Sequence, residues 1–267
     1  MPSAFVSVAR EPSFLETGGP LTRWHRIYRR AVERQWDCER DVDWAMPARV
    51  DDRRRESWVR LVTVFHTLES MGLVVVNDMS NGVARRIGDP SSQLYLGMQV
   101  ADEVRHVDCL RRYLAKLGHA PRRQPLYDAL GVFASKGYAR VENWLASTLF
   151  SENFATVFLR TSIDLGVDPF ATTFFTSFLK DEARHVNFLE NAIPDVFERC
   201  GVMRKAAVKV TQFGLLRFAT MLGRGLDRDA RAVGIDRVKL YDEVFQRMEH
   251  QWRTMGFEGL VVPPIPR

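Results

Sequence analysis

Apolar residues recur at intervals of three and four along most of the chain, and no stretch sustains the alternation of period two that is typical of strands. The sequence therefore predicts an all-α fold. Four long amphipathic patterns predict four long helices, over residues 52–86, 91–117, 138–165 and 169–191. Helices of this number and length favour a four-helix bundle.

Two short turns divide these helices into two pairs. Gly88 to Pro90 separates the first pair, and Gly166 to Pro169 separates the second. In each turn an Asp stands where it can cap the following helix, and a Pro stands at the first helical position, where its missing N–H is not needed. The sequence therefore predicts two helical hairpins.

The segments outside the hairpins add further helices. Residues 119–136 contain proline and glycine and are long enough to cross the bundle, with a short helix near 126–134. Helices are also expected over residues 21–36, 195–222 and 236–255, and an extended tail over 261–267. We assign residues 1–267 to one domain, with a core over 52–193 and a C-terminal helical extension over 194–256.

The composition is that of an ordinary globular protein, with 46% hydrophobic and 27% charged residues. The three cysteines, Cys38, Cys109 and Cys200, are far apart and form no Cys-x-x-Cys pair. We therefore expect neither a disulfide framework nor a thiolate zinc site, and we expect a cytoplasmic location. No apolar run reaches about 18 residues and the first residues do not resemble a signal peptide, so no membrane partner is expected. The net charge of +5 is the difference between 38 basic and 33 acidic residues. The short Arg runs are interpreted as solvated surface, so no nucleic-acid partner is expected.

One motif occurs twice. Residues 102–107 read DEVRHV and residues 181–186 read DEARHV, identical at five of six positions. Each motif has its Glu thirteen residues after the proline that opens its helix, which is about 20 Å along the helix. The chain therefore contains an internal duplication whose motifs lie at the same height of the bundle.

The spacing within the motif predicts a metal site. Glu and His are three residues apart, so they share one helix face. Two Glu and two His left empty in a bundle core would cost several kcal/mol as unpaired polar groups. A bound metal resolves that cost.

Each hairpin also carries a lone Glu at the mirror position of its motif. The midpoint between Glu69 and Glu103 falls beside the first turn, and the midpoint between Glu152 and Glu182 falls inside the second. The alternative is a duplicated hairpin with surface Glu and capping His residues. The predicted metal ligands, which match the plan of ferritin-like dimetal carboxylate proteins, are Glu69, Glu103, His106, Glu152, Glu182 and His185.

Over roughly residues 54–191 the sequence resembles the diiron carboxylate oxygenases, and its motif flanks are most similar to the hydroxylase α-subunits of bacterial multicomponent monooxygenases. The resemblance implies that Asp102 and Asp181 orient the imidazoles through their free ring N–H groups. It also implies that Arg105 and Arg184 are ion-pair partners and not metal ligands. The chain is much shorter than those subunits, which favours a stand-alone biosynthetic relative.

The same resemblance assigns a catalytic role to Thr156, four residues after Glu152 and beside the place where oxygen is activated. The alternative is a mid-helix Thr whose hydroxyl bonds back to a carbonyl. His66, three residues before Glu69, is interpreted either as an additional ligand or, more simply, as a packed histidine.

The chain lacks a diagnostic feature of each of three neighbouring families. A ribonucleotide reductase small subunit would carry a radical-bearing Tyr four residues after the first motif His, where this chain has Leu110. Arylamine N-oxygenases have an additional His four residues before the second motif Glu, where this chain has Phe178. Ferritins are shorter and lack the paired Asp and Arg. These differences therefore disfavour membership of the three families.

The pocket beside the metals is expected to be apolar, with room left at Gly72 and Ala155. The large apolar residues expected near the metal level are Phe65, Leu149, Phe150, Phe154, Phe174, Phe175 and Phe178.

Taken together, the sequence and the resemblance predict a non-haem diiron monooxygenase. Glu69 and His106 hold one iron, Glu152 and His185 hold the other, and Glu103 and Glu182 bridge them; an iron/manganese pair suits the same ligands. With O2 as co-substrate, the enzyme would hydroxylate or otherwise oxidise a small, largely apolar organic molecule. The alternatives are N-oxygenation, desaturation, or a ferritin-like metal-binding protein without turnover. No flavin or nicotinamide fingerprint is present, so an external reductase or ferredoxin is expected, and homodimerisation stays open.

Overall fold

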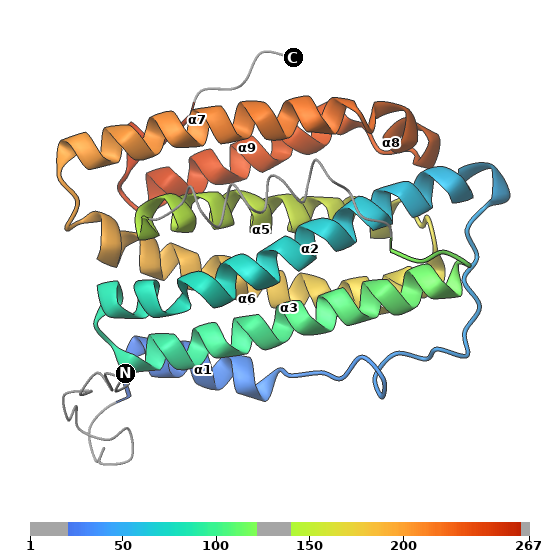
Figure 1. Cartoon of the computed structure of the whole chain (residues 1–267), viewed down its shortest axis with the longest axis horizontal. Helices are drawn as coiled ribbons and strands as arrows, with labels where there is room; N and C mark the ends of the chain where they lie inside the picture. Colours follow the sequence, from blue (N-terminus) through green and yellow to red (C-terminus); the bar gives the residue numbers. More distant parts are fainter. Residues whose placement is uncertain (1–20, 122–139, 263–267) are drawn as a thin grey trace, which may run out of the picture.

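Four long helices form two hairpins that pack side by side in the computed structural model, which describes residues 21–121 and 140–262 (Figure 1). Helix α2 pairs with α3, and α5 pairs with α6. Their bounds are Asp52–Ile87, Pro90–Lys116, Val141–Asp164 and Pro169–Phe197. Within the described residues there is no strand, which confirms the all-α fold. The expected short helix near 126–134 lies outside the described residues.

The turns begin their helices as the sequence predicts. Gly88 has φ 79°, a left-handed conformation that a side chain would strain, and it ends α2. Asp89 then caps α3 by accepting the Ser91 N–H at 2.8 Å. Asp168 caps α6 by accepting the Phe170 N–H at 3.1 Å. The capped, short turns keep the two helices of each hairpin aligned, and so hold each motif level with the lone Glu of its own hairpin.

The end of the fourth helix differs from the prediction. Helix α6 continues past residue 191 to Phe197, with Pro194 inside it, and the next helix begins after Gly201. A proline costs a helix about 3 kcal/mol, which is why the pattern suggested a break there. The helix persists because Ile193, Val196 and Phe197 are buried on one side of this last turn.

Within the described residues, five further elements surround the two hairpins. α1 (Arg23–Glu33) packs on α3, and it lies on the opposite edge of the molecule from α7 (Val202–Arg224) in Figure 1. α8 (Asp227–Val233) packs on α2, α9 (Arg237–Thr254) packs on α5, and a short 3-10 turn, η1, spans Glu258–Leu260. Helix α8 was not predicted, because seven residues are too few to show a clear period.

One cluster of buried apolar side chains runs from Trp24 to Leu260. The assignment of the whole chain to one domain stays a prediction, and this continuous cluster is consistent with it. By length and composition alone, α2 is the one helix in the described part of the chain that could span a membrane, with an apolar window that is 44% buried. Core helices of soluble proteins pass the same test, and α2 packs against α3, α5, α6 and α8.

Candidate metal centre

Six buried acidic and imidazole side chains converge halfway along the two hairpins. They are Glu69 from α2, Glu103 and His106 from α3, Glu152 from α5, and Glu182 and His185 from α6. The most exposed of them retains only 6% of its surface, and both histidines retain none. The structure therefore brings together all six residues that the sequence named as ligands.

Around His106, three carboxylates face the same ring nitrogen. Its Nδ1 lies 3.1 Å from Glu69 Oε2 and 3.5 Å from Glu182 Oε1. Glu103 Oε2 is somewhat farther away, at 4.0 Å. One imidazole nitrogen and several carboxylate oxygens thus face a common point, as the ligands of one metal ion do.

His185 has the matching arrangement from the other hairpin. Its Nδ1 lies 3.2 Å from Glu152 Oε2, 3.2 Å from Glu182 Oε2 and 3.6 Å from Glu103 Oε1. Glu103 and Glu182 therefore each direct one oxygen toward each histidine, while Glu69 and Glu152 each serve one side. This is the layout of two adjacent cation sites that share two carboxylates.

The outer nitrogens of the two imidazoles bond to aspartates across the bundle. His106 Nε2 lies 3.1 Å from Asp181 Oδ2, and His185 Nε2 lies 3.2 Å from Asp102 Oδ2. Each motif therefore supplies the carboxylate that orients the histidine of the other motif. Such a partner fixes the tautomer, leaving the opposite ring nitrogen free to accept a metal.

Two arginines neutralise these aspartates. Arg184 Nη2 lies 3.1 Å from Asp102 Oδ2 and also pairs with Asp181 on its own helix. Arg105 pairs with Asp102 and lies 3.8 Å from Asp181. Burial raises the pKa values of both aspartates, but the hydrogen bonds and charges of the partner histidines, together with the charge of Arg184, hold these pKa values below their usual range.

Sequence reasoning missed two polar side chains that complete this network after α1. Gln35 Nε2 donates to Asp102 Oδ1 at 3.2 Å, and Trp36 Nε1 donates to Asp181 Oδ2 at 2.7 Å. Neither residue belongs to a repeated motif, and both arrive from a segment far away in sequence. No spacing signal could have found them.

Gln99 is a third residue that was missed. Its Nε2 donates to Glu152 Oε1 at 3.1 Å, and its side chain is fully buried. Here a signal existed, because Gln99 lies four residues before Glu103 on the same face of α3. A buried Gln on the ligand face is a candidate donor to a metal-binding carboxylate.

The electrostatics of the cluster fit a cationic occupant. Burial raises the pKa values of Glu103 and Glu182, and neighbouring carboxylates raise them further. Burial alone would lower the pKa values of His106 and His185, but their acidic partners raise them well above the ordinary value. Without metal the cluster thus retains protons, and Glu182 Oε1 is a buried oxygen without a hydrogen bond. Divalent cations can replace those protons, so the donor set fits two of them.

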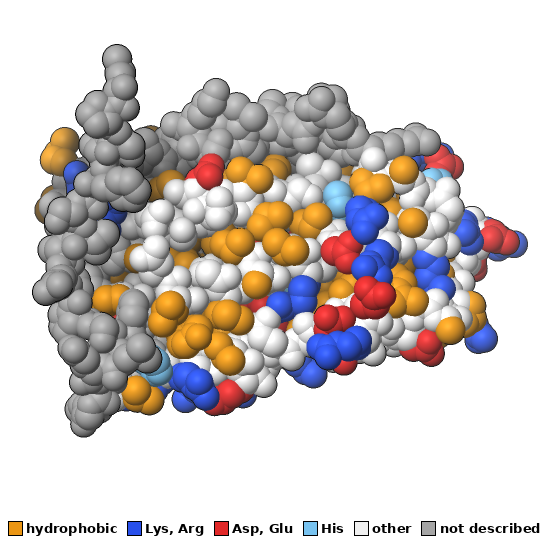
Figure 2. Space-filling view, turned by 60° about the horizontal axis from the view of Figure 1, so that its bottom comes forward, with side chains coloured by type: hydrophobic (Ala, Val, Ile, Leu, Met, Phe, Trp, Pro, Cys, Tyr) orange, Lys and Arg blue, Asp and Glu red, His pale blue; other side chains and the backbone are white. Residues whose placement is uncertain are grey.

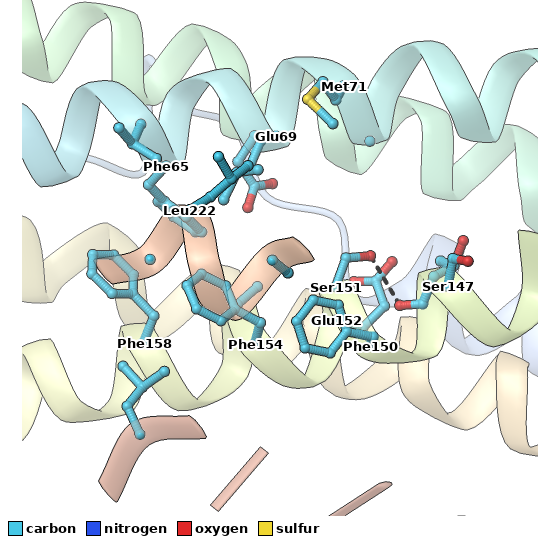
Figure 3. Close-up of a pocket in the computed structure, with 18 of the residues that line it drawn as sticks. Phe65, Glu69, Met71, Ser147, Phe150, Ser151, Glu152, Phe154, Phe158 and Leu222 are labelled. Atoms are coloured by element: carbon cyan, nitrogen blue, oxygen red, sulfur yellow. Dashed lines mark hydrogen bonds between the residues drawn. The ribbon is translucent and has the colours of Figure 1, made fainter. Parts of the chain in front are cut away.

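A cavity of about 230 Å³ adjoins the cluster on the side of α7, α8 and α9. Figure 3 shows Phe65 and Glu69 from α2 and Phe154 and Phe158 from α5 around it, with Leu222 entering from α7. Glu69, Glu103 and Glu152 form part of its wall, and most of the remaining wall is apolar. A substrate in this space would lie against the carboxylates.

The expected pocket residues divide into two groups. Phe65, Phe150, Phe154, Gly72 and Ala155 line the cavity, as expected. The expectation is wrong for four others, which are buried in the core and do not line it, because helical spacing alone does not show which side of a helix faces a cavity: Leu149, Phe174, Phe175 and Phe178. Phe178 instead stacks on the His106 ring, with centroids 4.0 Å apart.

Two other candidates do not join the cluster. The Thr156 hydroxyl donates to the Glu152 carbonyl oxygen at 2.8 Å, and Thr156 is not among the residues that line the cavity. This is the back-bonded geometry that was the alternative interpretation, and its catalytic role stays a prediction. The His66 ring is half-buried and makes none of the imidazole–carboxylate contacts found in the cluster.

Known structures resemble this fold. A variant of the R2-like ligand-binding oxidase with a Mn/Fe cofactor matches it with a TM-score of 0.65 and 17% identity, covering 87% of this chain and 93% of that chain. A variant with an Fe/Fe cofactor matches with a TM-score of 0.62 and 18% identity, covering 87% of this chain and 93% of that chain. A form of the same oxidase with an aerobically reconstituted metal cofactor after photoconversion matches with a TM-score of 0.62 and 17% identity, covering 91% of this chain and 94% of that chain. At these identities the likeness shows a shared ferritin-like fold. No curated protein sequence matches the chain.

A family model gives a more specific result. The model described as p-aminobenzoate N-oxygenase AurF matches residues 57–255. Phe178 therefore does not exclude the arylamine N-oxygenases, contrary to the prediction, and the resemblance to the monooxygenase hydroxylase subunits is not confirmed. Because the match spans more than half of the 267 residues, the chain belongs to the p-aminobenzoate N-oxygenase AurF family and is an oxygen-dependent oxidoreductase.

Proposed function

We propose that the chain binds two metal ions in the six-residue cluster and uses dioxygen to oxidise a small, largely apolar organic substrate in the adjoining cavity. Glu69 and His106 would hold one ion and Glu152 and His185 the other. Glu103 and Glu182 would be shared, and the observation that carries the proposal is that each directs one oxygen toward each histidine.

An iron pair or an iron/manganese pair fits this donor set of carboxylates and imidazoles. The similar oxidase structures contain Mn/Fe and Fe/Fe cofactors. A bound pair of redox-active ions in their reduced state would supply the electrons that dioxygen needs in order to react with an organic molecule. An external donor would restore those electrons, since the chain has no nucleotide-binding fingerprint.

The protein itself would position the metal ligands and exclude water from the cavity. Asp102 and Asp181 hold the two imidazoles in one tautomer, and Gln99 holds the Glu152 carboxylate by a hydrogen bond. The apolar wall of the cavity limits the water around the substrate, which strengthens every charge interaction at the cluster. Three carboxylates on one side of the cavity fix where oxidation takes place.

The family match favours N-oxygenation as the reaction type. Hydroxylation and desaturation are the alternatives on the same core. Incubating the reduced, metal-loaded enzyme with p-aminobenzoate under isotopically labelled dioxygen tests this choice. Mass spectrometry should find label bound to the amine nitrogen; label on carbon would favour hydroxylation, and loss of hydrogen without label would favour desaturation.

Metal content tests the site itself. Elemental analysis of protein purified without added metal should find about two metals per chain. Glu103→Ala and His185→Ala should each lower that number, whereas Glu56→Ala, which removes an exposed carboxylate of α2, should leave it unchanged. A wild-type protein with no metal or one metal would contradict the proposed centre.

Turnover needs a separate test, because a storage protein would also bind iron. Wild-type protein loaded anaerobically with ferrous iron is mixed rapidly with dioxygen and followed by absorbance. Fast, transient visible bands are expected for an oxygen-activating enzyme. Slow ferric mineralisation as the sole change would contradict the oxidase assignment while leaving the metal site intact.

A further inference from the structure

Helix α7 is apolar on its outer face as well as on its inner face. Its inner residues Val208 and Leu216 are buried, as expected for a helix that packs on α5. Its outer residues Met203, Val210 and Met221 keep 85%, 72% and 55% of their surface exposed. Their spacings of seven and eleven residues place them along one line of the helix. An exposed line of large apolar residues often marks an interaction surface, and this helix forms an outer edge of the molecule (Figure 1).

The charge of α7 has one sign. The helix contains five basic residues and no acidic one. Arg204 pairs with Glu142, and Lys205 lies over the Phe257 ring. The other three cations, which have no ion-pair partner within residues 21–121 and 140–262, are Lys209, Arg217 and Arg224.

The opposite side of the molecule is different. Figure 2 turns the α1 edge toward the viewer and shows acidic and basic side chains next to one another. Asp108, for example, pairs with both Arg111 and Arg112 on α3. Among the helices that the structure describes, α7 alone has no acidic residue, so its exposed apolar line lies beside positive charge only.

The inner face of the same helix forms part of the cavity wall. Leu215, Ala219 and Leu222 line the cavity that adjoins the carboxylate cluster. Whatever covers the outer face of α7 therefore lies one helix away from that cavity. An apolar covering would place the cavity next to an apolar phase.

We propose that the outer face of α7 docks on an anionic lipid surface, with Met203, Val210 and Met221 entering the apolar boundary and the unpaired cations meeting the headgroups. A second copy of the chain fits less well, because two such helices would bring positive charge together with no acidic residue on either. An acidic protein would satisfy the cations but not the apolar line. This proposal revises the expectation of no membrane partner, which considered spanning segments only.

Vesicle sedimentation with the full chain tests the proposal. Wild-type protein should sediment with vesicles of phosphatidylcholine and phosphatidylglycerol, but not with phosphatidylcholine alone, and added salt should release it. Arg217→Glu should weaken binding at least about fivefold, since each basic residue near an anionic surface contributes about that factor. Val210→Glu should weaken it comparably by placing a charge in the apolar line.

Matched controls come from the α1 edge. Arg30→Glu makes the same change in net charge on α1, and Leu21→Glu replaces an apolar residue that is 48% exposed. Both should sediment like wild type. Thermal melting by circular dichroism and metal content would verify that each variant is folded, and Met203→Glu would substitute for Val210→Glu if that variant were unstable.

Three results would overturn the proposal. Wild-type protein that stays in the supernatant with anionic vesicles would do so, as would α7 variants that bind as tightly as the α1 controls. A two-chain mass by light scattering that falls to one chain in Val210→Glu would assign the face to a second copy instead. None of these results would affect the proposed oxidation, which metal content and product analysis test independently.

Discussion

The metal cluster has two unlike sides, and the contrast shows how the protein divides its tasks. Toward α1, the cluster is backed by Asp102, Asp181, Arg105 and Arg184, whose charges and hydrogen bonds are paired with one another. Toward α7, it meets an apolar cavity of about 230 Å³. One side fixes the histidines, and the other leaves space for an organic molecule.

The two sides also differ in how much a substitution should matter. Removing one member of a buried charge network leaves its partners uncompensated, which costs several kcal/mol. Adding atoms to an existing cavity displaces nothing that is packed. Stability measurements on matched variants can therefore break or sharpen the comparison.

The largest expected effect is on the polar side. Asp102→Ala removes the partner of His185, Arg105 and Arg184, and should lower the free energy of unfolding by about 3–5 kcal/mol. The control is Asp108→Ala on the same helix, which breaks more exposed pairs with Arg111 and Arg112 and should cost about 1 kcal/mol or less. Chemical denaturation measures the free energy of unfolding of both variants. Equal losses in the two variants would contradict the buried charge network.

An intermediate effect should separate two alanines of α5. Ala146 is fully buried and does not line the cavity, so Ala146→Leu should overpack the core and cost about 1–3 kcal/mol. Ala155 lines the cavity, so Ala155→Leu should cost less than about 1 kcal/mol because its added atoms enter open space. If Ala155→Leu were the more destabilising variant, the cavity would not exist in solution.

The smallest effect concerns the boundary between the two sides. A Cβ on Gly72 would lie 3.3 Å from Glu103 Oε2, so Gly72→Ala should displace that shared carboxylate. Metal titration should then show affinity weakened by up to about tenfold, or about 1.4 kcal/mol. Gly97→Ala on α3, where no described residue lies within 4 Å of an added Cβ, should leave the affinity unchanged. Equal metal affinities in the two variants would show that Glu103 does not take part in metal binding.

Much of the fold could be predicted because helix periodicity and capping are local. The helix predicted over residues 52–86 is observed as Asp52–Ile87, and both capping aspartates are where the turns placed them. The predicted end of the fourth helix at residue 191 was wrong, because burial of the apolar residues around Pro194 outweighs the loss of one hydrogen bond. Local sequence signals do not report how deeply a segment is buried in the folded protein.

The candidate site follows the same division. The six carboxylate and imidazole residues could be predicted because duplication and hairpin symmetry constrain them to one height. Gln35 and Trp36 could not, because they reach Asp102 and Asp181 through packing of a distant segment. The cavity wall was only half predicted, since aromatic spacing identifies a buried face but not the neighbour that this face meets.

Family assignment from single residues was the weakest step. Phe178 was treated as evidence against the arylamine N-oxygenases, yet the family model matches residues 57–255. In the structure the Phe178 ring stacks on His106, so this position still acts on the cluster by packing. One departure from a motif changes local chemistry without removing a chain from its family.

Each of the two motifs supplies the aspartate that orients the histidine of the other motif. His106 of the first hairpin is oriented by Asp181 of the second, and His185 of the second by Asp102 of the first. Neither hairpin alone can orient its own histidine. If the duplication arose from a single ancestral hairpin, that ancestor required a second copy of itself to build the same centre, and the present chain keeps that dimer covalently joined.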